Sequence, residues 1–294
     1  MIFIAGATGF VGGHLRDYLV QKGCEVKVLV RSSAAGKQFL SKGIQTIPGD
    51  ITKPETLKGI LSPDDFIVHL VGIITEKGDT TFQKVHVEGT RNLVSEAKRA
   101  GVRHFFYQSA LGADIKGITP YLRTKAEAEE IVKSSGIPYT IFRPSLLIGP
   151  WDGFTKKMLD MIKISPVTPI PGDGKSRFQP LYIKDWLKCT LKVIEDPGGY
   201  SGTYELGGPQ QLSYSEIVQI MTESSGRTRM KVNIPMGLMK IAAAVASILP
   251  SPPVTTDQLL MLEQDNITDI DGIEKKFGFS PVPLKEALGE FINR

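Results

Sequence analysis

The chain opens with Met1-Ile-Phe-Ile-Ala-Gly6-Ala-Thr8-Gly9-Phe10-Val11-Gly12-Gly-His-Leu15, and this stretch decides its fold. The apolar run is typical of a buried parallel strand, and the residues after the glycines have helical spacing. Glycines in such a turn exclude side chains, so a pyrophosphate can approach the backbone at the positive end of the helix. Gly6, Gly9 and Gly12 therefore predict a nucleotide site, although their Gly-x-x-Gly-x-x-Gly spacing differs from the usual Gly-x-Gly-x-x-Gly. An ordinary β-α turn is the alternative.

Strands and helices alternate along the first half of the chain. Strands are expected at 25–30, 44–47, 65–71, 102–108 and 139–142, and helices at 81–100 and 121–134. This order predicts an α/β protein with a Rossmann-like, doubly wound parallel sheet. We expect a dinucleotide-binding core of residues 1–150, to which 177–208 return. Residues 151–176 and 209–294 should form a smaller, mostly helical C-terminal substrate-binding part, in which 165–176 form a loop.

Composition narrows the function. The 294 residues carry a net charge of only +4 and no nucleic-acid motif, so no nucleic-acid partner is expected. The two cysteines and four histidines show no ligand spacing, so no metal site is predicted. No apolar run is long enough to span a bilayer, and no signal peptide is recognised. We expect a cytoplasmic protein, with peripheral contact at the inner face of the membrane as a further possibility.

The residues after the second strand suggest which nucleotide binds. An NAD site usually has an acidic residue about 20 positions beyond the glycines, but here that position holds Arg31. A guanidinium can bind a 2'-phosphate, Ser32 and Ser33 add hydroxyls, and Lys37 adds a second cation. The sequence therefore favours NADP(H) over NAD(H), with a solvated surface arginine as the alternative.

Further nucleotide contacts are expected in the glycine turn and at the ends of later strands, where ligands bind in a doubly wound sheet. Asp50 and Ile51 could hydrogen-bond and cover an adenine, or simply form a turn. The complete set of further contacts is Thr8, Phe10, Val11, Asp50, Ile51, Val71, Gly72 and Pro144.

Three residues form a candidate catalytic set. Tyr121 and Lys125 are four apart on a predicted helix and share a face, while Ser109 ends the preceding strand. A nearby ammonium would favour the tyrosine phenolate, so Tyr121 could exchange a proton with a substrate oxygen during hydride transfer. Ser109 would hydrogen-bond the same oxygen, and Lys125 would also hold the nicotinamide ribose. His86 is interpreted as a packed or capping residue.

These motifs together resemble the extended and atypical short-chain dehydrogenase/reductases, which include NAD-dependent epimerases and dehydratases. Within them, the chain is most similar to the group of the NAD(P)-binding accessory subunit of respiratory complex I. The resemblance rests on the glycine turn and on the segments His86-Val-Glu-Gly-Thr-Arg-Asn-Leu93, Ser109-Ala-Leu-Gly-Ala-Asp114, Tyr121-Leu-Arg-Thr-Lys-Ala-Glu127, Arg143-Pro-Ser145 and Arg177-Phe-Gln-Pro180. It implies a bound NADP(H) or NAD(H) and a C-terminal substrate pocket. The asparagine usual in the fourth helix is replaced near His86.

Three functions remain open from the sequence. The first is an NAD(P)-dependent oxidoreductase acting on a carbonyl or hydroxyl of a small, partly apolar substrate, which could be lipid- or quinone-like. The second is a non-catalytic nucleotide-binding module of a respiratory or quinone-linked membrane complex, and the third is a sugar-nucleotide epimerase or dehydratase. The apolar stretch 236–249 is either a buried helix or a surface that contacts a membrane, a lipid-like substrate or a protein partner.

Overall fold

The computed structural model describes residues 1–32, 36, 39, 43–246 and 254–292. Within it the chain divides into two compact units. The first unit comprises Met1–Arg143 and Leu187–Tyr204, and the second comprises Pro144–Trp186 and Glu205–Arg294. The domain boundaries expected from the sequence, 1–150 with 177–208, stay a prediction.

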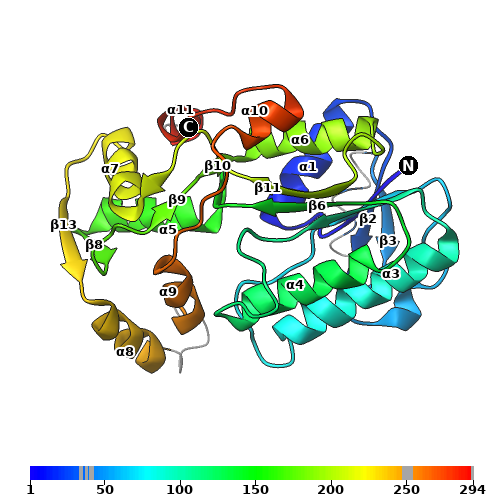
Figure 1. The fold of residues 1–294 in the computed structure, drawn as a ribbon, viewed down its shortest axis with the longest axis horizontal. Coiled ribbons are helices and arrows are strands. Elements are labelled where there is room, and N and C mark those ends of the chain that lie inside the picture. Colours follow the sequence, from blue (N-terminus) through cyan, green and yellow to red (C-terminus); the bar gives the residue numbers. More distant parts are fainter. Residues whose placement is uncertain (33–35, 37–38, 40–42, 247–253, 293–294) are drawn as a thin grey trace. The chain divides into compact units, whose positions relative to one another are not determined.

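A seven-stranded sheet forms the core of the first unit (Figure 1). Its strands are β1 (Ile2–Ala5), β2 (Val26–Val30), β3 (Gln45–Pro48), β4 (Phe66–His69), β5 (His104–Gln108), β6 (Tyr139–Pro144) and β11 (Gly202–Leu206), in the order β11-β6-β5-β4-β1-β2-β3. Neighbouring strands from β3 to β6 pair in parallel. The order reverses between β1 and β4, which is where ligands bind in open α/β sheets. The predicted doubly wound parallel sheet is confirmed.

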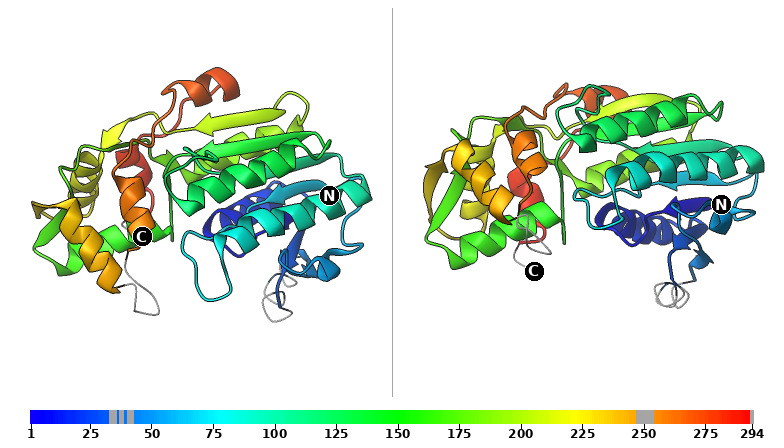
Figure 2. Two further views of the ribbon diagram at one scale, coloured as in Figure 1. Left: turned by 60° about the horizontal axis from the view of Figure 1, so that its bottom comes forward. Right: turned by 90° about the horizontal axis from the view of Figure 1, so that it is seen from below.

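Helices cover both faces of this sheet (Figure 2). Helices α3 (Gly89–Ala100) and α4 (Pro120–Lys133) run side by side along one face, while α1 (Phe10–Gln21) and α6 (Ile183–Glu195) lie on the other. The short helix η1 (Pro54–Leu57) follows β3, and η2 (Gln83–Glu88), which leads into α3, has π-helical hydrogen bonding. Local sequence sets the ends: Thr119 Oγ1 accepts from Leu122 N at the start of α4, and Gly101, with φ 69°, ends α3.

The second unit combines short strand pairs with helices. Its strands are β7 (Leu147–Ile148), β8 (Val167–Pro171), β9 (Arg177–Phe178), β10 (Leu181–Tyr182), β12 (Leu212–Ser213) and β13 (Met230–Ile234). They pair as β10-β7, β12-β9 and β13-β8. Its helices are α5 (Gly153–Ile164), α7 (Tyr214–Ser224), α8 (Met236–Ala246), α9 (Thr256–Leu262), α10 (Gly272–Phe277) and α11 (Leu284–Gly289).

The loop expected at 165–176 is wrong in part, because β8 occupies its centre and pairs in parallel with β13. The two prolines of β8, Pro169 and Pro171, hid this strand from sequence analysis, since proline cannot donate a ladder hydrogen bond. They lie two apart on a strand of a two-stranded sheet, where alternate N–H groups need no partner strand. The capping box expected before α7 is confirmed: Ser213 Oγ accepts from Glu216 N, and Glu216 Oε2 accepts from Ser213 N.

Candidate functional site

The three glycines of the first turn have different surroundings in the folded protein. Gly6 has φ +99°, and a Cβ there would lie 2.9 Å from Leu70 C. A Cβ on Gly12 would lie 2.2 Å from Gly6 O, so both positions require glycine for the fold itself. Gly9 is exposed, caps α1 with extended backbone, and a Cβ there would meet only Gly6 O at 3.6 Å. Nothing in the described protein requires glycine at position 9, so the space above it suits a ligand.

The loop after β4 borders this turn. Gly6 approaches Leu70 and Val71 closely, so Val71 and Gly72 lie beside the glycine turn at the point where the strand order reverses. Gly72 lies near the predicted catalytic helix, since a Cβ there would lie 3.4 Å from His86 Nε2 and 3.9 Å from Lys125 Nζ. The fold therefore brings the glycine turn, the loop after β4 and the predicted catalytic helix to one edge of the sheet.

Lys125 is held at the end of β5. Its Nζ donates to Gln108 O at 2.5 Å and lies 4.5 Å from the centre of the Tyr107 ring. Burial lowers the pKa of Lys125 to about 7. The next residue after Gln108, Ser109, is buried, and its hydroxyl lies near enough to the Glu129 carboxylate to help lower that group's pKa. A buried hydroxyl next to an anchored lysine places two polar groups together at the carboxyl end of β5.

Tyr121 occupies the first turn of α4, one turn before Lys125. Its ring packs edge-on against Phe82 and His86, with centroid separations of 5.8 and 5.6 Å. Burial raises the pKa of Tyr121 to about 12. This is opposite to the direction expected from the neighbouring ammonium, because in the protein chain alone desolvation of the phenolate is the cause that acts. The phenol of Tyr121 therefore stays protonated at neutral pH in the protein chain alone.

His86 is buried, and both of its ring nitrogens make hydrogen bonds. Ile73 N donates to His86 Nε2 at 3.1 Å, so the ring proton is on Nδ1, which donates to Thr124 Oγ1 at 3.0 Å. Thr124 Oγ1 in turn donates to Pro120 O at 2.8 Å. Burial and the nearby Lys125 lower the pKa of His86 to about 3, so the ring stays neutral. His86 thus links the loop after β4 to the first turn of α4, and the π-helical turn η2 supplies it.

A buried ion pair fixes the other end of α4. Arg143, near the end of β6, makes two hydrogen bonds to Glu129, from Nε to Oε1 at 2.8 Å and from Nη2 to Oε2 at 2.6 Å. Burial alone would raise the pKa of Glu129, but the hydrogen bonds from Arg143 hold it below its ordinary value. From the sequence, Arg143 was named only within a motif and Glu129 was not predicted. The spacing of Tyr121, Lys125 and Glu129 nevertheless places all three on one helix face.

The remaining predicted contacts differ in how the structure places them. Arg31 and Ser32 follow β2 and are exposed, whereas Ser33 and Lys37 lie outside the described residues. Asp50 Oδ1 accepts from Thr52 N and Oγ1, and the side chain of Ile51 is buried against Gly89, so the turn explains both. Thr8 is exposed in the glycine turn, Phe10 and Val11 are half-buried at the start of α1, and Pro144 ends β6.

The described residues contain no group of three or more His, Cys, Asp or Glu side chains arranged to hold a metal ion. Across the same described ranges, no helix has both the length and the apolar character needed to cross a membrane.

A doubly wound sheet, a glycine turn at its first strand and a Tyr-x-x-x-Lys helix at its carboxyl edge define the class of the extended and atypical short-chain dehydrogenase/reductases. More narrowly, the chain belongs to the NmrA-like family, whose model matches residues 1–291. The resemblance recognised in the sequence is confirmed at this level.

Two curated relatives and one solved structure illustrate the range of similar proteins. Subunit 9 of the mitochondrial NADH dehydrogenase (ubiquinone) 1 alpha subcomplex from Arabidopsis thaliana is 28% identical, over 98% of this chain and 76% of the relative. Ceramide reductase from Caulobacter vibrioides is 29% identical, over 86% of this chain and 81% of the relative. The UDP-glucose 4-epimerase of Thermus thermophilus, in its complex with NAD, shares the fold with a TM-score of 0.76 at 16% identity, covering 99% of this chain and 97% of the epimerase.

Proposed function

We propose that this protein binds a nicotinamide dinucleotide at the carboxyl edge of the first unit's sheet and reduces or oxidises a carbonyl or hydroxyl group there. The observation that carries the proposal is the arrangement around Lys125: its Nζ is anchored on Gln108 O, the next residue is the buried Ser109, and Tyr121 lies one helical turn away. The relatives support an oxidoreductase, since one is named a ceramide reductase.

The glycine turn and the loop after β4 would hold the nucleotide. Gly9 leaves open space at the start of α1, where backbone N–H groups and the helix dipole favour a pyrophosphate. Val71 and Gly72 would border the nicotinamide end of the nucleotide, and Lys125 would be available to the nicotinamide ribose. When bound, the nicotinamide supplies or accepts the hydride.

The protein's own groups would manage the proton. Tyr121, with a pKa of about 12, stays protonated at neutral pH and can donate to a carbonyl oxygen. Ser109 Oγ can hydrogen-bond the same oxygen, and Lys125, whose pKa is about 7, can shift the charge around Tyr121. His86 holds the turn that carries Tyr121 without changing its own charge.

The finer proposals concern cofactor, substrate and location. Arg31 is exposed at the end of β2 and occupies the position where an NAD site usually holds an acidic residue, which favours NADP(H) over NAD(H). We propose a small, partly apolar substrate of lipid or quinone type, and a cytoplasmic location with peripheral contact at the membrane. The sugar-nucleotide epimerase is less favoured, because Arg31 does not suit a tightly held NAD.

Substitution of Tyr121 by Phe tests the enzyme proposal. NADPH and NADH oxidation should be followed across aldehydes, ketones, long-chain ketones and quinones with the wild type, Tyr121→Phe and the control Tyr139→Phe at the amino end of β6. Turnover should fall ~10²-fold or more only in Tyr121→Phe, because a positioned acid contributes about that factor. Wild-type turnover that survives in Tyr121→Phe contradicts the assigned acid.

The second candidate is a nucleotide-binding module of a respiratory complex. It is favoured by the relative named as an NADH dehydrogenase subunit, which aligns with 98% of this chain. On this proposal the protein binds NADPH with ordinary affinity, shows no turnover with any substrate of the screen, and loses only stability in Tyr121→Phe.

A further inference from the structure

We propose that helix α8 and strand β13 of the second unit form a surface that docks onto an anionic lipid bilayer. The apolar face consists of Leu238, Ile241 and Val245 on α8 and of Met230 and Val232 on β13. The docking is independent of the nucleotide site, because none of these residues belongs to the first unit.

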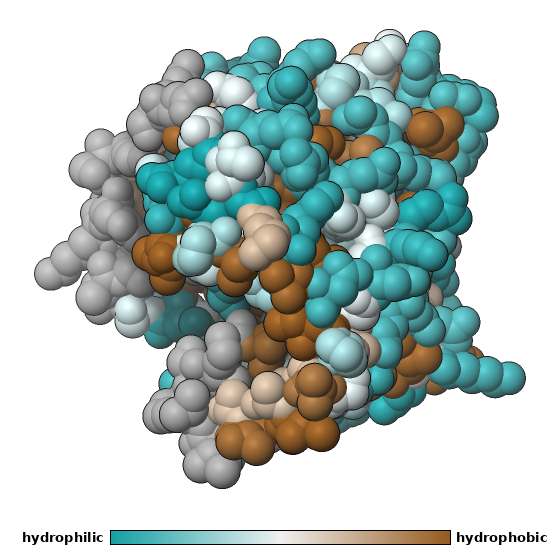
Figure 3. All heavy atoms as spheres, turned by 90° about the vertical axis from the view of Figure 1, so that its left-hand side faces the viewer, coloured by the Kyte–Doolittle hydropathy of each residue, from teal (hydrophilic) through white to brown (hydrophobic). Residues whose placement is uncertain are grey.

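The exposure on α8 is the first observation. Leu238, Ile241 and Val245 are 60%, 64% and 66% exposed, and their spacing of three and four residues places them on one stripe of the helix. Ala243, on the opposite side, is buried. A soluble helix normally turns its aliphatic stripe inward, so α8 presents to solvent the side that such a helix would hide. In Figure 3, hydrophobic residues gather at the bottom of the displayed face, where α8 lies.

Strand β13 extends the apolar face. Only Pro235 separates β13 from α8, and Met230 and Val232, which are 65% and 39% exposed, point to one side of the strand. Within the described part of the chain, the sheet of β13 contains only one further strand, β8. The exposed aliphatic side chains therefore continue from the helix to the strand next to it in the chain.

The charge pattern identifies the occupant as an anionic surface. Between Glu223 and Asp257 the chain carries four Lys or Arg residues and no Asp or Glu. Arg229 Nε donates to Ile162 O, and Lys231 Nζ donates to Ser215 Oγ near the Glu216 carboxylate, whose pKa Lys231 helps to lower. Arg227 is exposed and makes no ion pair with the residues that the structure describes. Basic residues flanking an exposed aliphatic stripe are the combination that binds anionic headgroups and the acyl boundary.

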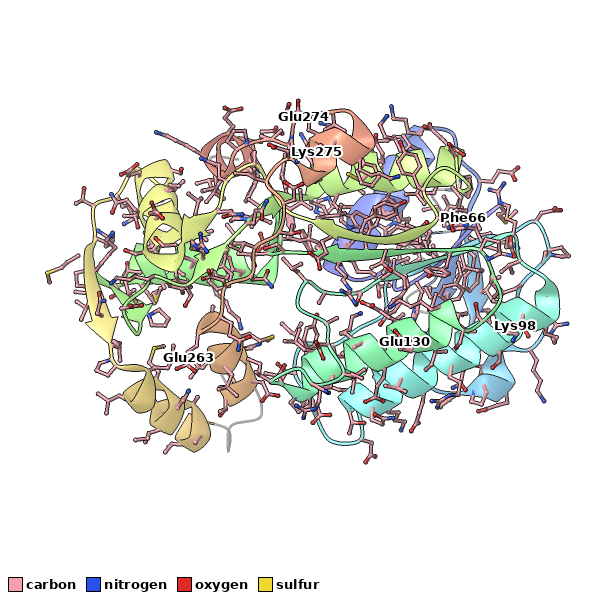
Figure 4. The ribbon with its side chains drawn as sticks, in the orientation of Figure 1. Phe66, Lys98, Glu130, Glu263, Glu274 and Lys275 are labelled. Carbon is pink, nitrogen blue, oxygen red and sulfur yellow. The ribbon has the colours of Figure 1, made fainter. Side chains whose placement is uncertain are left out.

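One cation of this region, Lys240, forms an ion pair within the second unit. Lys240 Nζ lies 2.7 Å from Glu263 Oε2, and Glu263, labelled in Figure 4, is the residue that caps the end of α9, the helix that packs against α8. This ion pair ties α8 to α9 and neutralises the one charged side chain of α8. The stripe of Leu238, Ile241 and Val245 is itself uncharged, as a surface that enters the acyl boundary should be.

The test uses the full chain with vesicles of phosphatidylcholine, with and without phosphatidylglycerol, at low and high salt. The wild type should float with the anionic vesicles at low salt and release at high salt. Ile241→Glu should lower the vesicle partition coefficient about tenfold or more, the loss expected when one aliphatic side chain no longer leaves water. Arg227→Gln with Lys231→Gln should lower it about fivefold per charge.

Matched controls are Ile270→Glu, which alters another exposed isoleucine of the second unit, and Lys285→Gln on α11. Both should bind vesicles like the wild type. Circular dichroism and thermal unfolding establish that each variant is folded. No binding of the wild type to anionic vesicles overturns the proposal, and so does equal loss in the controls. Sedimentation velocity without lipid gives a further test. A wild-type dimer that Ile241→Glu dissociates would overturn the proposal, since the apolar face would then bind a second copy of the chain.

Discussion

Gly9 and Gly12 provide a matched pair that separates nucleotide binding from folding. The two positions lie three residues apart in one turn, yet the protein surrounds them differently. A Cβ at Gly12 would lie 2.2 Å from Gly6 O, 2.8 Å from Gly6 C and 2.9 Å from Ala7 Cα, all backbone atoms. A Cβ at Gly9 would meet only Gly6 O, at the ordinary contact distance of 3.6 Å.

These distances set the expected magnitudes. Gly12→Ala must push α1 away from the turn after β1, and overpacking of this kind costs ~1–3 kcal/mol or more. Gly9→Val places a side chain in open space with an extended backbone that valine adopts readily. Its cost to the fold is that of a poor helix N-cap, about 1 kcal/mol, or a fall of roughly 2–4 °C in Tm. If Gly9 faces a pyrophosphate, the same side chain should lower NADPH affinity ~10²-fold or more, which corresponds to about 2.7 kcal/mol.

The assay combines thermal unfolding of the two variants with calorimetric titration of NADPH and NADH. Gly9→Val should keep a near-native circular dichroism spectrum and lose both nucleotides, whereas Gly12→Ala should lose stability first. Wild-type affinity in Gly9→Val would refute the assignment of the turn as the pyrophosphate site. Wild-type stability in Gly12→Ala would refute the steric reasoning on which the comparison rests.

Three further predictions concern charged and buried groups. Arg31→Ala should weaken NADPH binding ~10-fold or more while hardly changing NADH binding, and equal wild-type affinities for the two nucleotides would contradict the preference. Because burial lowers the pKa of Lys125 to about 7, the folded state gives up this proton at lower pH than the unfolded state. The charged Lys125 therefore destabilises the folded protein fully below about pH 7, and this destabilisation is relieved as pH rises toward 10.5. Lys125→Met should raise Tm most near pH 6. A difference in Tm between this variant and the wild type that does not change with pH would disprove this. His86→Phe removes the hydrogen bonds of the imidazole to Ile73 N and Thr124 Oγ1 and should lower kcat/KM ~10-fold. The pH profile of kcat/KM should stay unchanged between about pH 5 and 9, since the pKa of His86 is about 3.

The sequence predicted the parts of the site that depend on local pattern. The strand before Gly6, the helix after Gly9 and the capping box at Ser213 follow from residue type and spacing within one short window. The α/β fold class and the parallel sheet followed from the alternation of strand and helix patterns along the chain. Those features required no knowledge of which distant segments meet.

The parts that the sequence did not predict depend on contacts between distant segments. The role of His86 requires the backbone of Ile73 on one side and Thr124 on the other, which lie 13 and 38 residues away. The pairing of β8 with β13 joins segments that are far apart in the sequence, and prolines disguise β8 as a loop. The direction of the pKa shift of Tyr121 likewise depends on burial by Phe82 and His86, which residue spacing does not reveal.

The energetic cost of the site favours the enzyme over the structural module. Burial lowers the pKa of Lys125 to about 7 despite the opposing attraction of the Glu129 carboxylate, so keeping this charge inside destabilises the folded protein. Ser109 adds a buried hydroxyl directly after the end of β5, close to the Glu129 carboxylate. A methionine in place of Lys125 would remove this cost and leave the glycine turn untouched. A chain that uses the fold only to hold a nucleotide would still use Lys125 at the ribose, but it has no reason to retain Ser109 and Tyr121 together beside it. The joint presence of Ser109 and Tyr121 at the carboxyl edge is explained if both act on a substrate oxygen, which is why turnover lost in Tyr121→Phe, with affinity for NADPH retained, is the outcome that we expect.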